Sequence, residues 1–469
     1  MIHDGKTIAA VATGSGGAIA IIRLSGSEAF SIADAFFRAR NGVSVCEMAP
    51  FTISYGDFVA SDGEVVDDLL LSKFVAPRSY TGEDMVEFSV HASEYIKSRI
   101  LAQLITRGAR TAQPGEYTLR AYVNGKMDML GAEAVADIIA SDSRAGHTLA
   151  LSQMRGGYTA EFARLRGELV DLQSLLELEL DFGEEDVEFA DRSRLAESVD
   201  RAEHELTRLI DSYAQGSVIK EGVPVAIIGA PNSGKSTLLN ALLNEERAIV
   251  SSIAGTTRDS IEETLRLGDV LFRFIDTAGM RTTDDPLESI GIERARQKAQ
   301  KARVVLLTVD ISDYSHANDL TAAIARMRVE AGLSANTDTV ILLNKCDMLP
   351  AWPGADHLSS LASTTGAKVI AISAKRGSGL DHLRTHLLSL FGDIVTTESV
   401  VITSSRHIEQ LTATRTALRA TRTALTDGMP TDLIAAELRT ALHHLGLLTG
   451  EITTDEILGN IFSRFCIGK

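Results

Sequence analysis

The segment GAPNSGKST, from Gly229 to Thr237, constrains the fold of this chain more than any other stretch. It matches the pattern G-x-x-x-x-G-K-[ST] and follows the apolar run VPVAIIG, so it predicts a strand, a phosphate-binding loop and a helix in that order. Glycines let backbone N–H groups approach phosphates, and the start of the helix adds the positive end of its dipole. We expect Lys235 to contact the β and γ phosphates and Ser236 to bind Mg²⁺.

The region around this loop, from about Val223 to Gly392, alternates strand and helix patterns. The apolar runs VPVAIIG, RVVLLTVD, TVILLNK and AKVIAIS are each followed by a segment with helical spacing. This alternation is typical of a mostly parallel sheet with crossover helices. Within LRLGDVLFRFID, Gly268 and Asp269 form a two-residue turn between two alternating runs, which predicts one antiparallel pair.

The motif NKCD, from Asn344 to Asp347, follows the third of these runs and indicates which base is read. The carboxylate of Asp347 is an acceptor that can take the two N–H donors on the edge of guanine, and adenine presents no such pair. SAK, from Ser373 to Lys375, ends the next strand and is expected to close over the base. The sequence therefore predicts a guanine nucleotide.

Two further motifs, GTTRD and DTAG, complete an ordered set that is similar to the TRAFAC class of GTPases. In this set Thr257 resembles the switch threonine that binds Mg²⁺, and Asp276 resembles the acid of the metal's outer shell. The residues expected to bind GTP are Asn232, Ser233, Gly234, Lys235, Ser236, Thr237, Ser251, Ile253, Ala254, Gly255, Thr256, Thr257, Asp276, Thr277, Ala278, Gly279, Asn344, Lys345, Asp347, Ser373, Ala374 and Lys375.

The stretch DTAGMRTTDDPLES departs from Ras-like GTPases at one position. Met280 follows Gly279 where those proteins carry the glutamine that orients the attacking water, and a thioether cannot orient water. Asn232 offers an amide oxygen for a monovalent cation, K⁺, whose shell the loop from Ser251 to Thr257 could complete. Equally, Asn232 is a turn residue that stabilises its own loop. We leave the two roles open at this point.

Glu288 is the second group that could replace the glutamine. With Asp285 at the N-cap and Pro286 at the first helical position, it completes a capping box at the start of a helix. Alternatively, its carboxylate positions the attacking water through a second water. On geometry alone, the capping role of Glu288 is favoured over the role in positioning water.

Composition limits the class of protein. With 469 residues and a soft prior of about 150 per domain, the chain is expected to form about three domains. It has 46 basic and 63 acidic residues, a net charge of −17, so binding of nucleic acid requires a local basic patch or a second protein.

The three cysteines are far apart, which argues against a disulfide framework or a zinc knuckle. AIAIIRL, from Ala18 to Leu24, is too short for a membrane span, and we expect a soluble cytoplasmic protein.

The segments on both sides of the nucleotide-binding region have helical periodicity. Leucines also recur at heptad spacing near the end of the chain, and we expect both flanks to bundle together across the nested domain. The expected core positions are Phe162, Leu165, Leu169, Leu172, Leu176, Leu411, Leu418 and Leu425.

Three flanking stretches carry a closer resemblance. PRSYTGEDMVEF (77–88), PGEYTLRAYVNGKMDMLGAEAVADII (114–139) and the terminal FCIGK (465–469) resemble the MnmE (TrmE) family of tRNA modification GTPases over essentially the whole chain. The resemblance implies a multidomain protein of α/β and α+β class. Its expected parts are an α+β tetrahydrofolate-binding and dimerisation domain (1–118), a helical domain in two pieces (119–216 and 395–469) and an inserted Ras-like P-loop GTPase domain with a mostly parallel sheet (217–394).

The resemblance also implies an activity. Family members are homodimers that hydrolyse GTP with K⁺ and Mg²⁺ and act with an FAD-dependent MnmG-type partner as a heterotetramer. Together they add an aminomethyl or carboxymethylaminomethyl group to C5 of the wobble uridine (position 34) of certain tRNAs. The one-carbon donor is 5-formyl- or 5,10-methylene-tetrahydrofolate.

Site residues follow from the same resemblance, position by position. The resemblance implies that Glu288 is the catalytic residue. The ligands it implies are Ser236 and Thr257 for Mg²⁺, and Asn232, Ser251, Ile253 and Thr256 for K⁺. The folate ligands it implies are Arg23, Glu87, Lys126 and Lys469.

Each folate candidate has an ordinary structural explanation as well. Arg23 could be an edge charge, and Glu87 and Lys126 could be solvated partners of neighbouring charges. Lys469 ends the chain, although Phe462, Phe465 and Ile467 predict that the tail is docked. Cys466 is more readily a buried thiol than a catalytic group.

The chain departs from the family pattern in the N-terminal part. ATGSGGAIAI lacks the usual proline pair and arginine, VHAS replaces HGG, AQPGE replaces ARPGE, and SSRH lacks an asparagine. These differences concern the folate pocket.

Two other functions are consistent with the GTPase motifs, namely a ribosome-assembly switch and a scaffold without modification chemistry, and neither requires binding of 5-formyltetrahydrofolate.

Overall fold

The computed structural model describes most of the chain, and its contacts divide it into two compact units. The described residues are 4–14, 16–181, 192–244, 263–275, 296–297, 299–314, 316–333, 338–349, 354–391, 400–453, 455–463, 465 and 468. One unit comprises Met1–Ala140, Ala150–Thr207 and Glu409–Lys469, and the other comprises Ser141–Leu149 and Arg208–Ile408. The domain boundaries given above stay a prediction.

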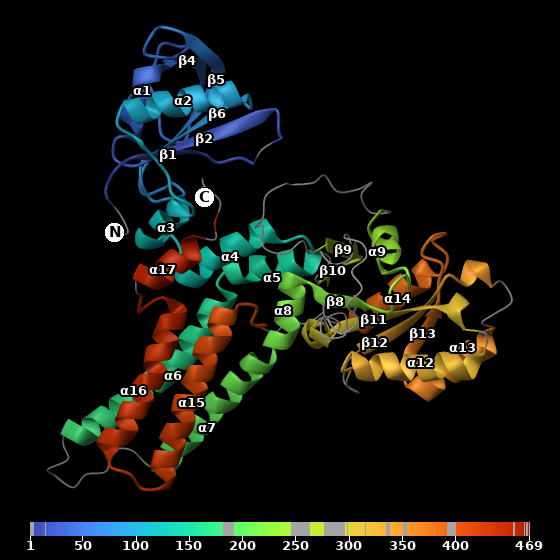
Figure 1. Cartoon of the computed structure of the whole chain (residues 1–469). Coiled ribbons are helices and arrows are strands. Elements are labelled where there is room, and N and C mark those ends of the chain that lie inside the picture. Colours follow the sequence, from blue (N-terminus) through green and yellow to red (C-terminus); the bar gives the residue numbers. More distant parts are fainter. Residues whose placement is uncertain are drawn as a thin grey trace. The chain divides into compact units, whose positions relative to one another are not determined.

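The first unit begins with a seven-stranded sheet of order β3-β4-β5-β6-β2-β1-β7 (Figure 1). Only the pair β1 and β7 is parallel. The strands are β1 (Ile8–Val11), β2 (Ile19–Ser25), β3 (Phe37–Ala39), β4 (Ile53–Val59), β5 (Val65–Phe74), β6 (Met85–His91) and β7 (Arg110–Thr111).

The two helices α1 (Ala29–Phe36) and α2 (Glu94–Thr106) cover one face of this sheet. Alternation along β2 explains the arrangement, because Ala20, Ile22 and Leu24 are buried against the helices and the residues between them face the other side. The ring of Phe58 contacts those of Phe36 and Phe88 at the centre of this core. Burying one such side chain contributes about 2–3 kcal/mol.

Helices make up the rest of the first unit. Short helices α3 (Glu116–Val123), α4 (Met129–Ala140) and α17 (Asp455–Phe462) share a small apolar core. The long helices are α6 (Gly157–Asp181), α7 (Arg192–Asp211), α15 (Ser405–Thr426) and α16 (Thr431–Thr449), of which α7 and α15 continue into the second unit. All eight apolar positions expected from periodicity are buried, which confirms that prediction.

Polar contacts join the long helices at their surfaces. Thr431 Oγ1 in α16 donates to Glu179 Oε1 in α6 at 2.7 Å. Arg422 Nε in α15 lies 2.7 Å from Asp200 Oδ1 in α7. These contacts connect helices from both ends of the sequence, as expected for a bundle made from two chain segments.

The second unit contains a six-stranded sheet of order β13-β12-β11-β8-β10-β9. Its strands are β8 (Val223–Ile228), β9 (Glu263–Leu267), β10 (Val270–Phe274), β11 (Val304–Asp310), β12 (Asp338–Asn344) and β13 (Lys368–Ala371). β9 and β10 are antiparallel around the turn at Gly268, whose φ is +55°, and the other pairs are parallel. The four parallel strands and the hairpin were predicted, and the fold class is confirmed.

Helices cover both faces of this sheet (Figure 1). α9 (Lys235–Asn244) and α14 (Leu380–Phe391) pack on one face, and α12 (Ala317–Glu330) and α13 (Ala355–Thr365) pack on the other. Two further described helices are α5 (Arg144–Met154) and α8 (Tyr213–Glu221), and α8 leads directly into β8. The carboxyl ends of β8, β12 and β13 lie at one edge of the sheet, where such folds bind ligands.

None of the described helices combines the length and the hydropathy needed to cross a bilayer.

Candidate functional site

The phosphate-binding loop connects the end of β8 to the start of α9. A Cβ on Gly229 would lie 2.2 Å from the carbonyl oxygen of Thr308, so no other residue fits there. Gly234 has a φ of +92°, and a Cβ on it would lie 2.2 Å from Nδ2 of Asn344. Both glycines of the motif are therefore required by packing against neighbouring strands as well as by approach to phosphate.

Lys235 is the first residue of α9, and its amine folds back over the loop. Nζ donates to the carbonyl oxygens of Gly229 and Ala230 at 3.0 and 2.7 Å. The amine thus lies against the backbone of the loop, and phosphate oxygens can replace these carbonyls. The side chains of Ser236 and Thr237 are exposed at the same helix start, where phosphates are expected to bind.

Asn232 has a left-handed backbone conformation, with a φ of +61°. Asparagine tolerates this conformation better than most residues, which supports its role as a turn residue. Its side chain is exposed and makes no hydrogen bond to any described residue, so the amide oxygen does not stabilise the described part of the loop. The two roles are compatible, because the backbone makes the turn and the side chain is available for an ion.

Asn344 links the three nucleotide motifs. Its buried side chain donates from Nδ2 to the carbonyl oxygen of Ser233 at 2.8 Å. Its Oδ1 accepts from the backbone N–H of Ala374 at 3.0 Å. This asparagine therefore fixes the phosphate-binding loop and the SAK loop relative to NKCD. The sequence indicated the motif, but this linking role depends on contacts between distant segments.

Asp347 presents its carboxylate at the same edge of the sheet. Ser373 Oγ donates to Oδ1 at 2.7 Å, and Arg376 Nε lies 3.3 Å from Oδ2. The hydrogen bond from Ser373 lowers the pKa of Asp347 below its ordinary value, and the positive charges of Arg376 and Lys375 act in the same direction. The carboxylate is thus ionised and can only accept hydrogen bonds, as reading of guanine requires.

Lys345 also has a left-handed conformation, with a φ of +66°, and its amine forms an ion pair with Asp310 at the end of β11. Burial would raise the pKa of Asp310, but the hydrogen bonds from Lys345 and Ser312 outweigh it, and the pKa is lowered. Asp310 and Arg376 were not among the predicted site residues. The only sequence signal for Asp310 is an acid that ends the strand VVLLTVD.

Several predicted residues lie outside the described part of the chain. They are Ser251, Ile253, Ala254, Gly255, Thr256, Thr257, Asp276, Thr277, Ala278, Gly279, Met280, Glu288, Cys466, Ile467 and Lys469. Their assignments to Mg²⁺, to K⁺, to catalysis and to folate stay predictions.

Arg23 and Glu87 lie opposite each other on β2 and β6 of the first unit. Arg23 Nε and Nη2 are 2.8 and 2.7 Å from Glu87 Oε1. The guanidinium lies 5.3 Å from the ring centre of Tyr80 and 5.4 Å from that of Tyr117. Because β2 lies between β6 and β1, Arg23 is not an edge charge. It is a largely buried cation between two aromatic rings and an acid.

Lys126 and Gly468 each contact another segment of the first unit. Lys126 Nζ donates to the carbonyl oxygen of Pro77 at 2.9 Å, in the loop that carries Tyr80. Near the end of the chain, a Cβ on Gly468 would lie 2.2 Å from the carbonyl oxygen of Val11 in β1. Phe462 and Phe465 are buried, which confirms the docked tail for these two residues.

Comparison with known proteins places these features in a family. The model of the MnmE helical domain matches residues 129–466, and the model of the GTP-binding protein TrmE N-terminus matches residues 7–126. The protein named tRNA modification GTPase MnmE from Flavobacterium johnsoniae is 46% identical over 466 residues, which cover 99% of both chains. Its namesake from Parabacteroides distasonis is 46% identical over 473 residues, which cover 99% of this chain and all of the relative.

Solved structures add little. The FeoB G-domain from Methanococcus jannaschii aligns with 37% of this chain and 98% of its own length at 24% identity, with a TM-score of only 0.25. The family models and the full-length relatives are sufficient, and they show that this chain belongs to the MnmE (TrmE) family.

Proposed function

We propose that this chain is a K⁺-dependent GTP hydrolase that acts in the modification of the tRNA wobble uridine in the cytoplasm. The observation that carries the proposal is the set of contacts by which Asn344 fixes the phosphate-binding and SAK loops around the ionised carboxylate of Asp347. Relatives that match over the full length are named tRNA modification GTPases, which supports the same activity.

In this proposal, Lys235 and Asp347 bind and orient GTP. Lys235 exchanges its contacts with Gly229 and Ala230 for phosphate oxygens, and Asp347 accepts from the guanine edge. We assign Mg²⁺ to Ser236 and Thr257, and K⁺ to Asn232 with Ser251, Ile253 and Thr256. When bound, the two ions neutralise charge that develops on the phosphates. The exposed amide oxygen of Asn232 fits this assignment, because alkali ions are bound by oxygen.

Replacing KCl by NaCl at equal ionic strength is expected to slow GTP hydrolysis by roughly tenfold or more, because a charge-stabilising group is removed from the transition state. Turnover of GTP under saturating conditions measures this. Asn232→Ala should be slow in both salts, and Asn240→Ala, which alters an exposed asparagine of α9, should retain the difference. Equal rates of the unaltered chain in the two salts would remove K⁺ from the proposal.

We further propose that the first unit binds a reduced folate as one-carbon donor, 5-formyl- or 5,10-methylene-tetrahydrofolate. Glu87 offers an acceptor for N–H donors of a pterin edge, and the rings of Tyr80 and Tyr117 flank the neighbouring Arg23. Lys126 and Lys469 supply positive charge for the carboxylates of the glutamyl tail. The docking of Phe462 and Phe465 supports a position of the chain end in this unit.

A homodimer through the N-terminal domain is supported by apolar side chains that are exposed on one face of its sheet. On the face opposite α1 and α2, the side chains of Ile19, Ile53, Tyr55 and Leu70 are between 45% and 67% exposed. A sheet face with several exposed apolar side chains is typical of an interaction surface. A second copy of the chain is the partner that the family implies.

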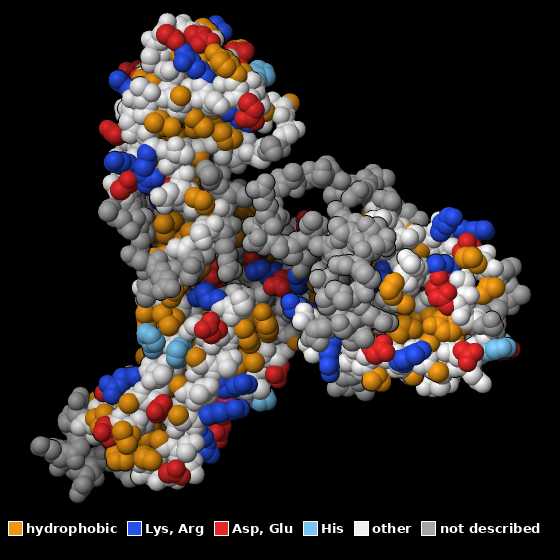
Figure 2. Space-filling model, viewed as in Figure 1, with side chains coloured by type: hydrophobic (Ala, Val, Ile, Leu, Met, Phe, Trp, Pro, Cys, Tyr) orange, Lys and Arg blue, Asp and Glu red, His pale blue; other side chains and the backbone are white. Residues whose placement is uncertain are grey.

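Binding of tRNA is expected to need the FAD-dependent MnmG-type partner. The chain has a net charge of −17. On the face of the molecule in Figure 2, the basic side chains that are described are interspersed with acidic ones and form no extended basic surface. Phosphate contacts supply most of the affinity for nucleic acid. A partner with a basic surface would therefore supply the phosphate contacts that this face of the chain does not offer.

A further inference from the structure

The loop of residues 75–84 joins β5 to β6 beside the proposed folate site and has no helix or strand of its own. It supplies Tyr80, whose ring lies over Arg23, and the carbonyl oxygen of Pro77, which accepts from Lys126. Loops at the surface are generally mobile unless side chains hold them. The position of both groups therefore depends on what holds this loop.

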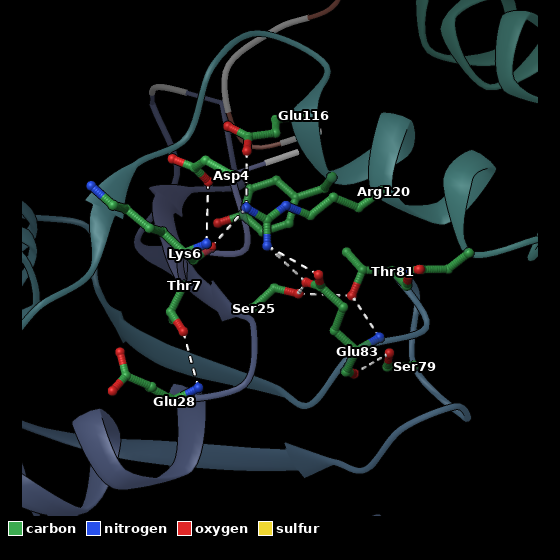
Figure 3. Close-up of polar contacts among 12 residues, drawn as sticks. Asp4, Lys6, Thr7, Ser25, Glu28, Ser79, Thr81, Glu83, Glu116 and Arg120 are labelled. Carbon is green, nitrogen blue, oxygen red and sulfur yellow. Dashed lines mark hydrogen bonds and ion pairs between the residues drawn. The ribbon is translucent and has the colours of Figure 1, made fainter. Parts of the chain in front are cut away.

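A buried ionic network holds it from one side (Figure 3). Arg120 in α3 is 1% exposed, and its Nη1 lies 3.1 and 3.0 Å from the two carboxylate oxygens of Glu83. Its Nη2 donates to Glu116 Oε1 at 3.0 Å and to the carbonyl oxygen of Lys6 at 2.8 Å. One guanidinium thus connects the loop, α3 and the N-terminal segment.

Hydroxyl groups extend the network into the loop. Ser25 Oγ, at the end of β2, donates to Glu83 Oε2 at 2.8 Å and lies 2.7 Å from Thr81 Oγ1 (Figure 3). Thr81 is fully buried, and Asn124 Nδ2 donates to its carbonyl oxygen at 2.8 Å. The loop is therefore held at Thr81, which is next to Tyr80, and at Glu83, on the other side of Gly82.

An ionic network of this kind does little for stability, because the cost of removing charges from water offsets their attraction. Its more specific effect is to fix geometry. We propose that the network of Arg120, Glu83, Thr81 and Ser25 positions Tyr80 and Pro77 for binding of the reduced folate. These four are positioning residues, and the inference rests on the proposed folate site.

The test is Thr81→Val, which keeps the shape and the β-branched backbone preference but removes the hydroxyl. The ligand is 5-formyltetrahydrofolate, titrated by calorimetry into the full-length chain. We expect the affinity to fall about tenfold or more, because Ser25 and the N–H of Glu83 both lose a buried partner. Thr81→Ser, which restores the hydroxyl, should recover binding to near the original value.

A matched control separates positioning from general destabilisation. Thr414→Val also removes a fully buried hydroxyl, which donates to the carbonyl oxygen of Gln410 within α15. It should lower the melting temperature about as much as Thr81→Val and leave folate affinity unchanged. If Thr81→Val does not fold, Ser25→Ala removes the same contact from the side of β2.

The outcomes are distinct. A chain that binds 5-formyltetrahydrofolate, with Thr81→Val binding it equally well, would overturn the positioning role and leave the folate site intact. Equal losses of affinity in Thr81→Val and Thr414→Val would also overturn it. If the unaltered chain binds no folate, the folate site itself is wrong and the inference fails with it.

Discussion

Asp347→Asn is expected to weaken GTP binding roughly a hundredfold, because two hydrogen bonds to an ionised acceptor are replaced by those of a neutral amide. The amide also places a donor where guanine presents its own amino group. Xanthine has a carbonyl oxygen at that position, so the variant should bind xanthosine triphosphate better than the unaltered chain does. Competition of each nucleotide against a fluorescent guanine nucleotide measures both effects.

The control for this variant is Asp356→Asn, an exposed aspartate in the first turn of α13 in the same unit. It removes the same charge away from the motif and should leave both affinities unchanged. If Asp347→Asn bound GTP as tightly as the unaltered chain, Asp347 would not read the base. The hydrogen bond from Ser373 would then have only a structural role.

Glu288→Ala is expected to reduce the rate of GTP hydrolysis by roughly a hundredfold or more while leaving GTP affinity nearly unchanged. Met280 cannot orient the attacking water, so a group elsewhere has to do it, and general acid–base groups contribute effects of about this size. Single-turnover hydrolysis and nucleotide binding, measured on the same preparation, separate the two quantities.

The alternative role of Glu288 is to complete the predicted capping box at the start of a helix. The variant Asp285→Ala, which removes the other side chain of that box, is the control for this role. An N-cap aspartate contributes about 1 kcal/mol to its helix, so if Asp285 is the predicted N-cap, its loss should lower the melting temperature but spare hydrolysis. If the two variants lost stability equally and both kept their turnover, Glu288 would be only a cap. The water would then have to be positioned by another group.

The nucleotide-binding sheet could be predicted from the sequence because its signals are local. Each strand is a short apolar run, the hairpin has a two-residue turn at Gly268, and the loop motif requires a strand before it and a helix after it. The motifs also lie at the carboxyl ends of their strands, and in a parallel sheet these ends share an edge. That edge brings Lys235, Asn344, Asp347 and Ser373 into one unit.

The polar contacts that complete the sites could not be predicted in the same way. Asn344 and Ser233 are 111 residues apart, and Arg120 and Glu83 are 37 residues apart. Arg376 directly follows SAK, but nothing in its spacing indicates that it would pair with Asp347. In the N-terminal sheet, the order of the strands also decided that Arg23 is an interior residue and not an edge charge. Such contacts depend on tertiary packing, which periodicity does not encode.

The central claim is that this chain acts in modification of the wobble uridine, and nucleoside analysis of tRNA tests it most directly. Total tRNA from cells that lack the gene would be digested, and the uridine derivatives substituted at C5 measured by mass spectrometry. We predict that the aminomethyl and carboxymethylaminomethyl derivatives disappear and return with the unaltered gene but not with Glu288→Ala. The same amounts of these nucleosides with and without the gene would contradict the account.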